Sequence, residues 1–465
     1  TDNDVQQLAE YTNDLQHRYD ELREQQDTNA PSYFSSQQEQ EQQQQAGISD
    51  DTCALNQQSW ENTSYFGEYS NYAIHVSMLR DKVRCSAYRR AIDKFANVDF
   101  KEKVVLDVGC GSGILSCFAA RAGAKRVYAV EASKMYKKAR LVVARNGFEK
   151  VVNVMHGKIE ALVQQNAIPE KVDVIISEWM GALLLHEGMW QAVLYARDYL
   201  LKEGGRMYPR FANMYLAPIN YKELWATNLS YLHDVEGIDM SVLKPGIIKE
   251  FSNSVVKSTV VSPELLISDG QLIRVIDMLY ISQKELSELK TLPFQYSVVS
   301  RKDSPTGSGQ YYEYHKNVQW KKGEDRLTFH GMALWFDVVF TPPNARDANI
   351  VFERIQLKFD QNRPTGDASS SSSDCSKQPL SSSMDGQLYE KKEEETGSIV
   401  LSTRPGVRTH WEQDIVLFQK HVDLKEGDII KGIVRMKQNQ TWRRHFDFEF
   451  SFSIETHEFY KYVVS

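Results

Sequence analysis

A short apolar segment that leads directly into closely spaced glycines places the strongest constraint on how this chain folds. Residues 104–108 (Val-Val-Leu-Asp-Val) have the composition of a buried strand, and Gly109, Gly111 and Gly113 follow at once. A helical pattern then continues to Ala122. A glycine turn between a strand and a helix lets a ligand approach the backbone and meet the N–H groups at the helix start. The segment therefore predicts a ligand-binding turn.

Strands and helices continue to alternate after this turn, and helices precede it. Apolar residues recur at helical spacing over 71–96, which predicts one or two amphipathic helices. Alternation of this kind is typical of a parallel, doubly wound sheet. We therefore expect a Rossmann-like α/β domain over residues 59–209. Its further strands are expected at 126–130, 151–155 and 172–177, and its further helices at 134–146 and 189–201.

Short alternating apolar runs replace this rhythm after Pro209. Such runs are typical of an antiparallel sheet or barrel, so we expect an antiparallel β-barrel domain over residues 210–465. Residues 221–245 have helical and aromatic character and are expected to form an arm that packs on another subunit. A serine run within 364–397 predicts a disordered insertion. The expected strands lie at 212–218, 254–261, 294–299, 331–340, 350–359, 398–401, 415–418, 428–436 and 446–454.

The first 58 residues differ in composition from the rest of the chain. Residues 37–45 contain only glutamine and glutamate, and apolar residues are sparse around them. Such a segment buries too little apolar surface to offset its ordering entropy. Residues 5–22 have some helical spacing and could form a helix with a partner. We expect residues 1–58 to be a disordered, glutamine-rich segment.

The composition indicates the general class of protein. With 465 residues, the chain is long enough for two or three domains. Its 55 Lys and Arg against 62 Asp and Glu give a net charge of −7, which argues against a duplex-binding surface and suits a cationic substrate. The sequence contains no membrane-length apolar run, no signal-peptide pattern and no CxxC pair among its five cysteines. We expect a cytoplasmic or nuclear protein without a metal site, a membrane anchor or sequence-specific nucleic-acid binding.

The spacing of the glycines distinguishes between kinds of nucleotide ligand. The dinucleotide fingerprint needs a glycine at position 114, where this chain has Ile114. Glu131 ends the second expected strand and can accept both ribose hydroxyls of a nucleoside. A charge on Asp107 would repel a pyrophosphate, whereas S-adenosylmethionine has a positive sulfonium and no phosphate. The sequence therefore favours S-adenosylmethionine over a dinucleotide, and over a glycine turn that only packs a helix on a strand.

Two glutamates occur in an apolar loop after the fourth expected strand. Glu178 belongs to a Ser-Glu-Trp-Met-Gly segment, and Glu187 closes the loop. Ligands of open parallel sheets bind outside the carboxyl ends of the strands, where this loop is expected. Two carboxylates in apolar surroundings need a cation, and a guanidinium presents a planar fork of donors that matches them. The alternatives are acids that cap a helix, and a metal site, for which a third ligand at suitable spacing is missing.

Together these segments resemble the protein arginine methyltransferase family. The resemblance rests on the glycine turn, the two-glutamate loop and Thr409-His410-Trp411, and it covers about residue 60 to the C-terminus apart from the serine-rich insertion. It implies a Rossmann-like methyltransferase domain, then a β-barrel with a dimerisation arm, and methyl transfer from S-adenosylmethionine to protein arginine. Further matches are Tyr65-Phe66, Tyr69, His75, Met78-Leu79-Arg80-Asp81, Arg84 and Gly157-Lys158-Ile159-Glu160.

The resemblance also implies roles for individual residues. Glu178 and Glu187 would hold the substrate guanidinium, and a pair formed by Asp81 and His410 would fix the N-terminal helix against the barrel and help the proton leave. Arg84 would pair with the carboxylate of the donor, although Asp81 and Arg84 could instead pair with each other on one helix. The implied cofactor-binding residues are Tyr69, His75, Arg84, Gly109, Gly111, Glu131, Ile159, Glu160 and Met189. The implied substrate-binding residues are Tyr65, Met78, Trp179 and Trp411.

The chain departs from the family pattern within the two-glutamate loop. Ala182, His186 and Gly188 stand where the family commonly has tyrosine, an aromatic residue and serine, which concerns substrate preference rather than the reaction. Met78 and Trp179 agree with the type I branch, which forms asymmetric dimethylarginine. We therefore expect a homodimeric type I-like enzyme that acts on Gly/Arg-rich segments, as in RNA-binding proteins, or on histone tails. The alternative is a catalytically weak regulatory partner of an active relative.

Overall fold

The computed structural model describes residues 62–221, 229–251, 255–258, 260–298, 327–342, 397–425, 427–454 and 459–464. All of them belong to one unit, Trp60–Ser465. The expectations for residues 1–58, for a strand at 350–359 and for residues 364–396 lie outside the described residues. Among the described helices, none combines the length and apolar character needed to cross a bilayer.

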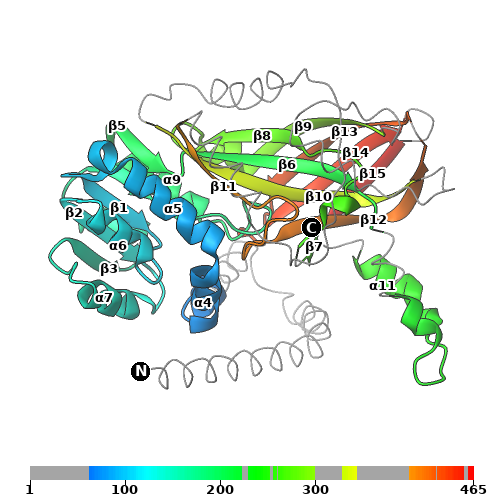
Figure 1. Ribbon diagram of the computed structural model, residues 1–465, viewed down its shortest axis with the longest axis horizontal. Coiled ribbons are helices and arrows are strands. Elements are labelled where there is room, and N and C mark those ends of the chain that lie inside the picture. The colour runs from blue at the N-terminus through cyan, green and yellow to red at the C-terminus, as the bar shows by residue number, and fades with distance from the viewer. Residues whose placement is uncertain are drawn as a thin grey trace, which may run out of the picture. The chain divides into compact units, whose positions relative to one another are not determined.

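The predicted parallel sheet is confirmed (Figure 1). Its strands are β1 (Val104–Val108), β2 (Arg126–Glu131), β3 (Val152–His156), β4 (Val172–Ile176) and β5 (Leu201–Tyr208). They pair in the order β3-β2-β1-β4-β5, and every pair is parallel. The sequence did not predict β5 as a strand. Residues 202–204 of this strand are exposed and Gly204 and Gly205 lie in its middle, so it shows neither a continuous apolar run nor an alternation.

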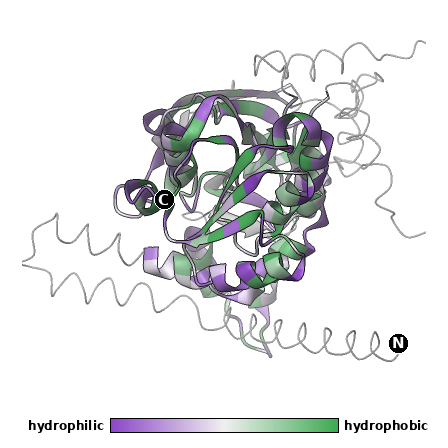
Figure 2. Cartoon of the chain, turned by 90° about the vertical axis from the view of Figure 1, so that its left-hand side faces the viewer, coloured by the Kyte–Doolittle hydropathy of each residue, from purple (hydrophilic) through white to green (hydrophobic). Residues whose placement is uncertain are grey.

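Helices pack along this sheet through one apolar face each. In α5, for example, Ala87, Tyr88, Ala91 and Ile92 are buried, at the spacing of one helical face. Figure 2 shows hydrophobic and hydrophilic residues on the same helices beside a largely hydrophobic sheet. The helices of this domain are α4 (Tyr72–Arg80), α5 (Lys82–Lys94), α6 (Ile114–Arg121), α7 (Tyr136–Arg145), α8 (Ile159–Gln164) and α9 (Trp190–Leu200), and residues 62–68 are also helical.

The predicted antiparallel β-domain is confirmed after Pro209, and its described strands form two sheets. One sheet contains β6 (Phe211–Ile219), β7 (Val255–Ser258), β8 (Gln271–Asp277), β10 (Leu327–Phe340), β11 (Ile399–Ser402) and β12 (Gln413–Leu424). The other contains β9 (Glu288–Ser297), β13 (Ile429–Gln438), β14 (Phe446–Ile454) and β15 (Phe459–Val464). The sequence did not predict β8 or β15, which lie at the ends of their sheets.

Phenylalanines join the two antiparallel sheets into one core. The ring centroid of Phe329 on β10 lies 5.4 Å from that of Phe418 on β12 and 5.3 Å from that of Phe452 on β14. All three side chains are almost fully buried and belong to the same hydrophobic cluster as the α/β domain. The two domains therefore share a continuous core, and residues of one can support a site on the other.

The predicted helical arm is present where the structure describes it, but it does not end at residue 245. Turns at Tyr231–His233 and Ser241–Leu243 lead into α11 (Lys244–Phe251), which extends away from the barrel strands in Figure 1. Pro245 lies in the first turn of α11, where its missing N–H removes no helical hydrogen bond. Proline therefore begins this helix, although the sequence analysis placed the end of the arm there.

Candidate active site

The candidate site lies where two neighbouring parallel strands end. β1 pairs with β2 on one side and with β4 on the other, so the chain order reverses between β1 and β4. The glycine turn follows β1 and the two-glutamate loop follows β4. Ser177, directly after β4, donates its hydroxyl hydrogen to the carbonyl of Val108, at 2.8 Å. Such a switch point of strand order is where open α/β sheets bind their ligands.

The glycine turn is held in place by Glu131 at the end of β2. Its Oε2 accepts a hydrogen bond from the N–H of Gly111 at 2.8 Å, and its Oε1 accepts one from the N–H of Ser133 at 2.7 Å. Gly109 and Gly111 have φ values of 72° and 53°, in the left-handed region that favours glycine. Glu131 therefore ends β2 directly against the glycine turn.

Three more of the predicted cofactor-binding residues lie around this turn. A Cβ atom added to Gly109 would lie 2.2 Å from Cε of Met189, and one added to Gly111 would lie 3.2 Å from the His75 ring. Nε2 of His75 donates a hydrogen bond to the carbonyl of Tyr69 at 2.8 Å. The turn is thus enclosed by side chains from α4 and from the residue before α9.

The start of α8 is attached to the same strand end. The N–H of Gly157 donates to the carbonyl of Glu131 at 3.0 Å, and α8 begins two residues later at Ile159. Ile159 is buried, whereas Glu160 is partly exposed. This arrangement places both residues beside the carboxyl end of β2.

Asp107 behaves differently from the charged group that the sequence suggested. Its side chain is fully buried, and its Oδ2 accepts a hydrogen bond from the Ser116 hydroxyl at 2.6 Å. Burial raises the pKa of Asp107 to about 7. A full charge at Asp107 is therefore not what excludes a pyrophosphate, and the argument against a dinucleotide rests on the glycine spacing and Glu131.

The two-glutamate loop has an unusual backbone. Leu183, Leu184 and Glu187 have φ values of 52°, 68° and 71°, a region that residues with a side chain rarely adopt. Gly181 lies against the loop so closely that an added Cβ would sit 2.2 Å from the carbonyl oxygen of His186. The N–H of Leu183 donates to Oδ2 of Asp414 on β12 at 2.6 Å. Residues of both domains thus hold a strained loop, as is typical of functional sites.

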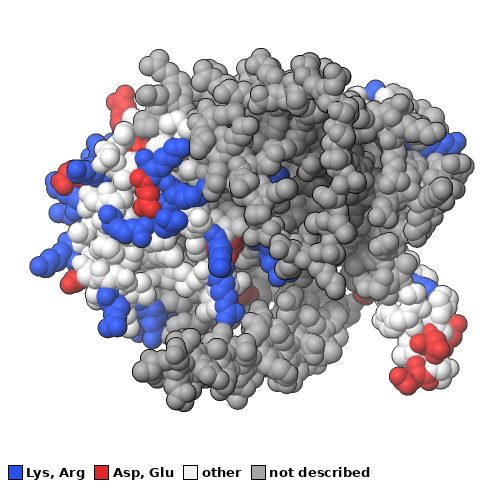
Figure 3. All heavy atoms as spheres, viewed as in Figure 1, with Lys and Arg blue, Asp and Glu red and all other residues white. Residues whose placement is uncertain are grey.

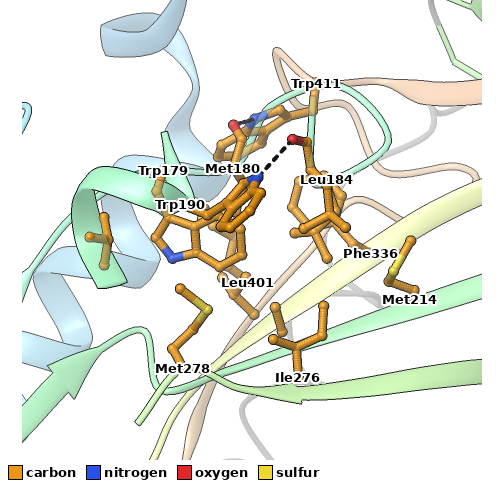
Figure 4. Close-up of a cluster of buried hydrophobic side chains, with 14 of the residues drawn as sticks. Trp179, Met180, Leu184, Trp190, Met214, Ile276, Met278, Phe336, Leu401 and Trp411 are labelled. Carbon is orange, nitrogen blue, oxygen red and sulfur yellow. Dashed lines mark hydrogen bonds between the residues drawn. The ribbon is translucent and has the colours of Figure 1, made fainter. Parts of the chain in front are cut away.

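Tryptophans pack against this loop in the buried cluster of Figure 4. Nε1 of Trp411 donates to the carbonyl of Met180 at 2.7 Å, and Nε1 of Trp190 donates to the carbonyl of Leu185 at 3.2 Å. Trp179 and Trp411 are only 2% and 4% exposed and belong to the shared core. The sequence analysis expected both side chains to bind substrate, and in the structure both are buried in this core. Their surroundings are those of supporting residues.

The two glutamates bind different partners on the N-terminal helices. Nε and Nη2 of Arg84 both lie 3.1 Å from Oε2 of Glu178, and the Tyr69 hydroxyl donates to Oε2 of Glu187 at 2.6 Å. Burial lowers the pKa of Arg84, but Glu178 more than reverses this effect and the net pKa is raised. Burial and the charges of both glutamates raise the pKa of Tyr65 and Tyr69, so these phenols stay protonated.

The alternative in which Asp81 and Arg84 pair through their side chains is not what the structure contains. Asp81 is the N-cap of α5, and its Oδ1 accepts a hydrogen bond from the backbone N–H of Arg84 at 2.8 Å. Its Oδ2 accepts from Nδ1 and from the backbone N–H of His410, at 2.8 and 2.9 Å. Burial raises the pKa of Asp81, but these hydrogen bonds outweigh it and the net pKa is lowered. The predicted contact between α5 and the β-domain is confirmed.

The sequence analysis missed Arg444, which lies in the turn between β13 and β14. The Arg444 guanidinium lies 3.8 Å from the ring centroid of Tyr65 and donates to Oδ1 of Asn62 at 2.7 Å. The guanidinium also donates a hydrogen bond to the carbonyl of Glu187. In return, the N–H of Glu187 donates to the carbonyl of Arg444 at 2.7 Å. No local sequence pattern identifies this arginine, because its role depends on segments far away in the chain.

Met78, also predicted for the site, is buried, and its carbonyl accepts a hydrogen bond from Nη1 of Arg84 at 3.3 Å.

The groups described above are suited to a reaction of a positively charged substrate. They combine a nucleoside-type turn, two carboxylates beside two neutral phenols, and a buried arginine bonded to one of the carboxylates. Among the described residues, no group of three or more His, Cys, Asp or Glu side chains could hold a metal ion.

Comparisons with known proteins agree with this geometry. One family model, described as ribosomal protein L11 methyltransferase, matches residues 89–190. Another, described as the arginine methyltransferase oligomerization subdomain, matches residues 210–353 and 384–457. Among solved structures, the Trypanosoma brucei PRMT1 enzyme-prozyme heterotetrameric complex with AdoHcy has 27% sequence identity and a TM-score of 0.61. That match covers 85% of this chain and 99% of the other. Protein arginine methyltransferase 10 of Arabidopsis thaliana also has 27% identity, with a TM-score of 0.60, over 86% of this chain and 99% of the other.

Two curated relatives establish the family. Protein arginine N-methyltransferase 2 of Dictyostelium discoideum is 35% identical over 87% of this chain and 76% of its own length. Probable protein arginine N-methyltransferase 6 of Arabidopsis thaliana is 35% identical over 86% of this chain and 81% of its own length. With this degree of identity over most of both sequences, and with the two-glutamate loop at the strand ends, the chain belongs to the protein arginine methyltransferase family.

Proposed function

We propose that this protein methylates arginine side chains of proteins, with S-adenosylmethionine as the donor, and that it forms asymmetric dimethylarginine. One observation carries the proposal: Glu178 and Glu187 lie on one strained loop next to the glycine turn, with Tyr69 bonded to one and Arg84 to the other. Paired carboxylates at this place bind a guanidinium better than any neutral acceptor.

The residues present fit S-adenosylmethionine. Glu131 lies against the glycine turn, where it can accept ribose hydroxyls, and Gly109 and Gly111 leave no side chain in the way. Arg84 offers a buried cation for the donor carboxylate. When bound, the donor supplies a methyl group on a positive sulfonium.

The protein residues then have to orient the substrate guanidinium and distribute its charge. The guanidinium is protonated at neutral pH, so positioning matters more than a strong base. Arg84 reaches only Oε2 of Glu178, and the substrate can use the other oxygen. The Tyr69 hydroxyl holds Glu187 in place. Methyl transfer to the guanidinium would release one proton from the substrate, and Glu187 or the pair of Asp81 and His410 would receive it.

Mass spectrometry of an Arg-Gly-Gly peptide after incubation with S-adenosylmethionine tests both parts of the proposal. Fragmentation separates asymmetric from symmetric dimethylarginine. The expected result is monomethyl product followed by asymmetric dimethyl product. Symmetric dimethylarginine would refute the assignment to the type I branch. A reaction that stops at monomethylarginine would point to Ala182, His186 and Gly188 as determinants of the second methyl transfer.

We also propose that the enzyme is a homodimer joined through the arm. The arm exposes Tyr231, Ile238, Val242 and Leu243, and the N-terminal helices expose an apolar stripe at helical spacing, Tyr72, Val76, Leu79 and Val83. Figure 3 shows acidic side chains at the end of the arm and basic side chains over the α/β domain. The acidic residues are Asp234, Glu236 and Asp239, and exposed basic residues on or beside α7 are Lys134, Lys137 and Lys138. Opposite charges and matching apolar patches favour contact between an arm and the α/β domain of a second copy.

Sedimentation at micromolar concentration tests the dimer. The wild-type chain is expected to sediment as a dimer, and Val242→Glu, which places a charge on the most exposed apolar residue of the arm, is expected to give monomers. A wild-type monomer would refute the proposal.

The observation that favours the regulatory-partner alternative is the enzyme-prozyme complex among the similar structures. It predicts no product without an added active relative, whereas the intact pair Glu178 and Glu187 favours activity on its own.

A further inference from the structure

The backbone of Glu187 is bonded on both sides by a single residue. Its N–H donates to the carbonyl of Arg444 at 2.7 Å, and its carbonyl accepts a hydrogen bond from Nη1 of Arg444. Glu187 has φ 71°, and this conformation persists in a residue with a side chain only where the surroundings hold it. Arg444 supplies those surroundings for both backbone polar groups of Glu187.

The same arginine also binds the N-terminal helix. Nη2 donates to Oδ1 of Asn62 at 2.7 Å, and the guanidinium stacks over the Tyr65 ring at 3.8 Å. Tyr65 packs in turn on Tyr69, with ring centroids 4.7 Å apart, and Tyr69 donates to the Glu187 carboxylate. Arg444 therefore fixes both the backbone of Glu187 and the phenol that orients its side chain.

The turn that carries Arg444 is itself well ordered. Oδ1 of Asn439 accepts hydrogen bonds from the N–H groups of Thr441 and Trp442 at 2.9 and 2.8 Å, and its Nδ2 donates to Asp447 at 2.8 Å. The N–H of Asn439 donates to the carbonyl of His445 at 3.0 Å. We call residues 439–445 the clamp turn.

A second contact attaches the loop to the end of the clamp turn. Nε2 of His186 accepts a hydrogen bond from the N–H of Phe446 at 3.2 Å, and its ring lies 5.3 Å from that of His445. Gly188, which follows Glu187, has φ 67°, and a Cβ atom added to it would lie 3.6 Å from the Arg443 carbonyl oxygen and 3.6 Å from Cα of Arg444. Two of the positions where this chain departs from the family pattern therefore face the clamp turn.

We infer that the clamp turn positions the catalytic carboxylate, with Arg444 as the positioning residue that holds Glu187 in its strained conformation and against Tyr69. The inference rests on the proposed function for its kinetic consequences, but its structural consequence can be measured without turnover. The contacts described for Arg444 lie on the two-glutamate loop and on the N-terminal helix, so its loss should leave the donor site unchanged.

The test compares Arg444→Met and Arg444→Lys with the same substitutions at Arg443, the adjacent exposed arginine. Arg444→Met is expected to lower kcat with an Arg-Gly-Gly peptide at least tenfold and to raise the peptide KM, with the Kd for S-adenosylmethionine within twofold of wild type. Arg444→Lys keeps the charge and one donor and should restore part of kcat. The Arg443 variants should remain within twofold of wild type.

Hydrogen exchange measured by mass spectrometry provides the second readout. Amides in residues 181–190 are expected to exchange at least tenfold faster in Arg444→Met than in Arg443→Met, with unchanged exchange in residues 104–113. If kcat and exchange both match the Arg443 control, the inference is wrong. If the wild-type enzyme makes no product but the exchange difference is present, the proposed function fails while the clamp stands. If the Arg444→Met variant exchanges faster throughout the chain, it has lost its fold, and the Arg444→Lys variant then decides in the same assay.

Discussion

The glycine turn and the two-glutamate loop lie at neighbouring strand ends, but they are built in different ways. The turn is held by Glu131, which bonds Gly111 from 20 positions away and Ser133 from two. The loop is held by Asp414, Trp411 and Arg444, whose bonds span 231, 231 and 257 positions. The donor half of the site is therefore a local structure of the α/β domain. The acceptor half is assembled from both domains.

Substitution of the loop carboxylate should produce the largest effect and separate the two halves. Glu187→Gln keeps the shape but removes the charge opposite the substrate guanidinium, and kcat is expected to fall on the order of 100-fold or more. Donor affinity should stay within twofold, because the turn is built without Glu187. Steady-state kinetics and calorimetric titration with S-adenosylhomocysteine check both values. The matched control is Glu203→Gln, on the exposed part of β5. Equal turnover in the two variants would show that Glu187 is not catalytic.

The opposite pattern is expected from the donor half. Glu131→Gln weakens charge-assisted hydrogen bonds to the turn and to the ribose, at a cost of about 1.5–3 kcal/mol. The Kd for the donor should therefore rise at least tenfold, while kcat at saturating donor changes less than threefold. Titration of donor into each variant measures this. A large loss of kcat with normal donor affinity would mean that the two halves are not separable.

The pH dependence of stability reports the contact between the loop and the β13–β14 turn. Burial, followed by the neighbouring His445, lowers the pKa of His186 to about 4. The unfolded chain takes up a proton at this residue near pH 6.5 and the folded one only near pH 4. Stability is therefore lost as the pH falls through this window, by at most about 2 kcal/mol between pH 7 and pH 5.

Replacement of this histidine should remove that part of the pH dependence. His186→Phe keeps an aromatic ring but cannot titrate, so its unfolding free energy should vary less between pH 7 and pH 5 than that of wild type. The control variant is His233→Phe, because His233 is an exposed residue of the arm. Denaturant unfolding at both pH values measures the difference. Identical slopes for His186→Phe and wild type would show that His186 is not held neutral.

The smallest effect is expected from the support beneath the loop. Asp414→Asn weakens the bond to the N–H of Leu183 and should lower the unfolding free energy by about 1 kcal/mol. Turnover should drop several-fold, because a loop with three left-handed residues relaxes when one support weakens. Urea unfolding and peptide kinetics test this, with donor affinity as the internal control. A loss of donor affinity would contradict the division into two halves.

Much of the fold and the donor half could be predicted from the sequence. Strands β1 to β4 and helices α4 to α7 and α9 follow from apolar periodicity, and Glu131 follows from its position at the end of β2. Helix α8 was not predicted. Strand β5 was missed because glycine and exposed charge interrupt its pattern. The end of the arm was misplaced because Pro245 begins α11 rather than ending a helix. The charge assigned to Asp107 was overestimated because burial cannot be inferred from its neighbours in the chain.

The sequence by itself determined the parallel sheet, the glycine turn, the positions of both glutamates and, through Thr409-His410-Trp411, the family. Each of these depends on residues that are close in the chain or on periodicity, which local geometry dictates. Only the tertiary structure decided that Trp179 and Trp411 lie in the core, that Arg84 binds Glu178, and that Arg444 and His186 attach the loop to the second domain. These outcomes depend on which distant segments the shared core brings together. A strained loop is stable only where such distant partners bond its backbone.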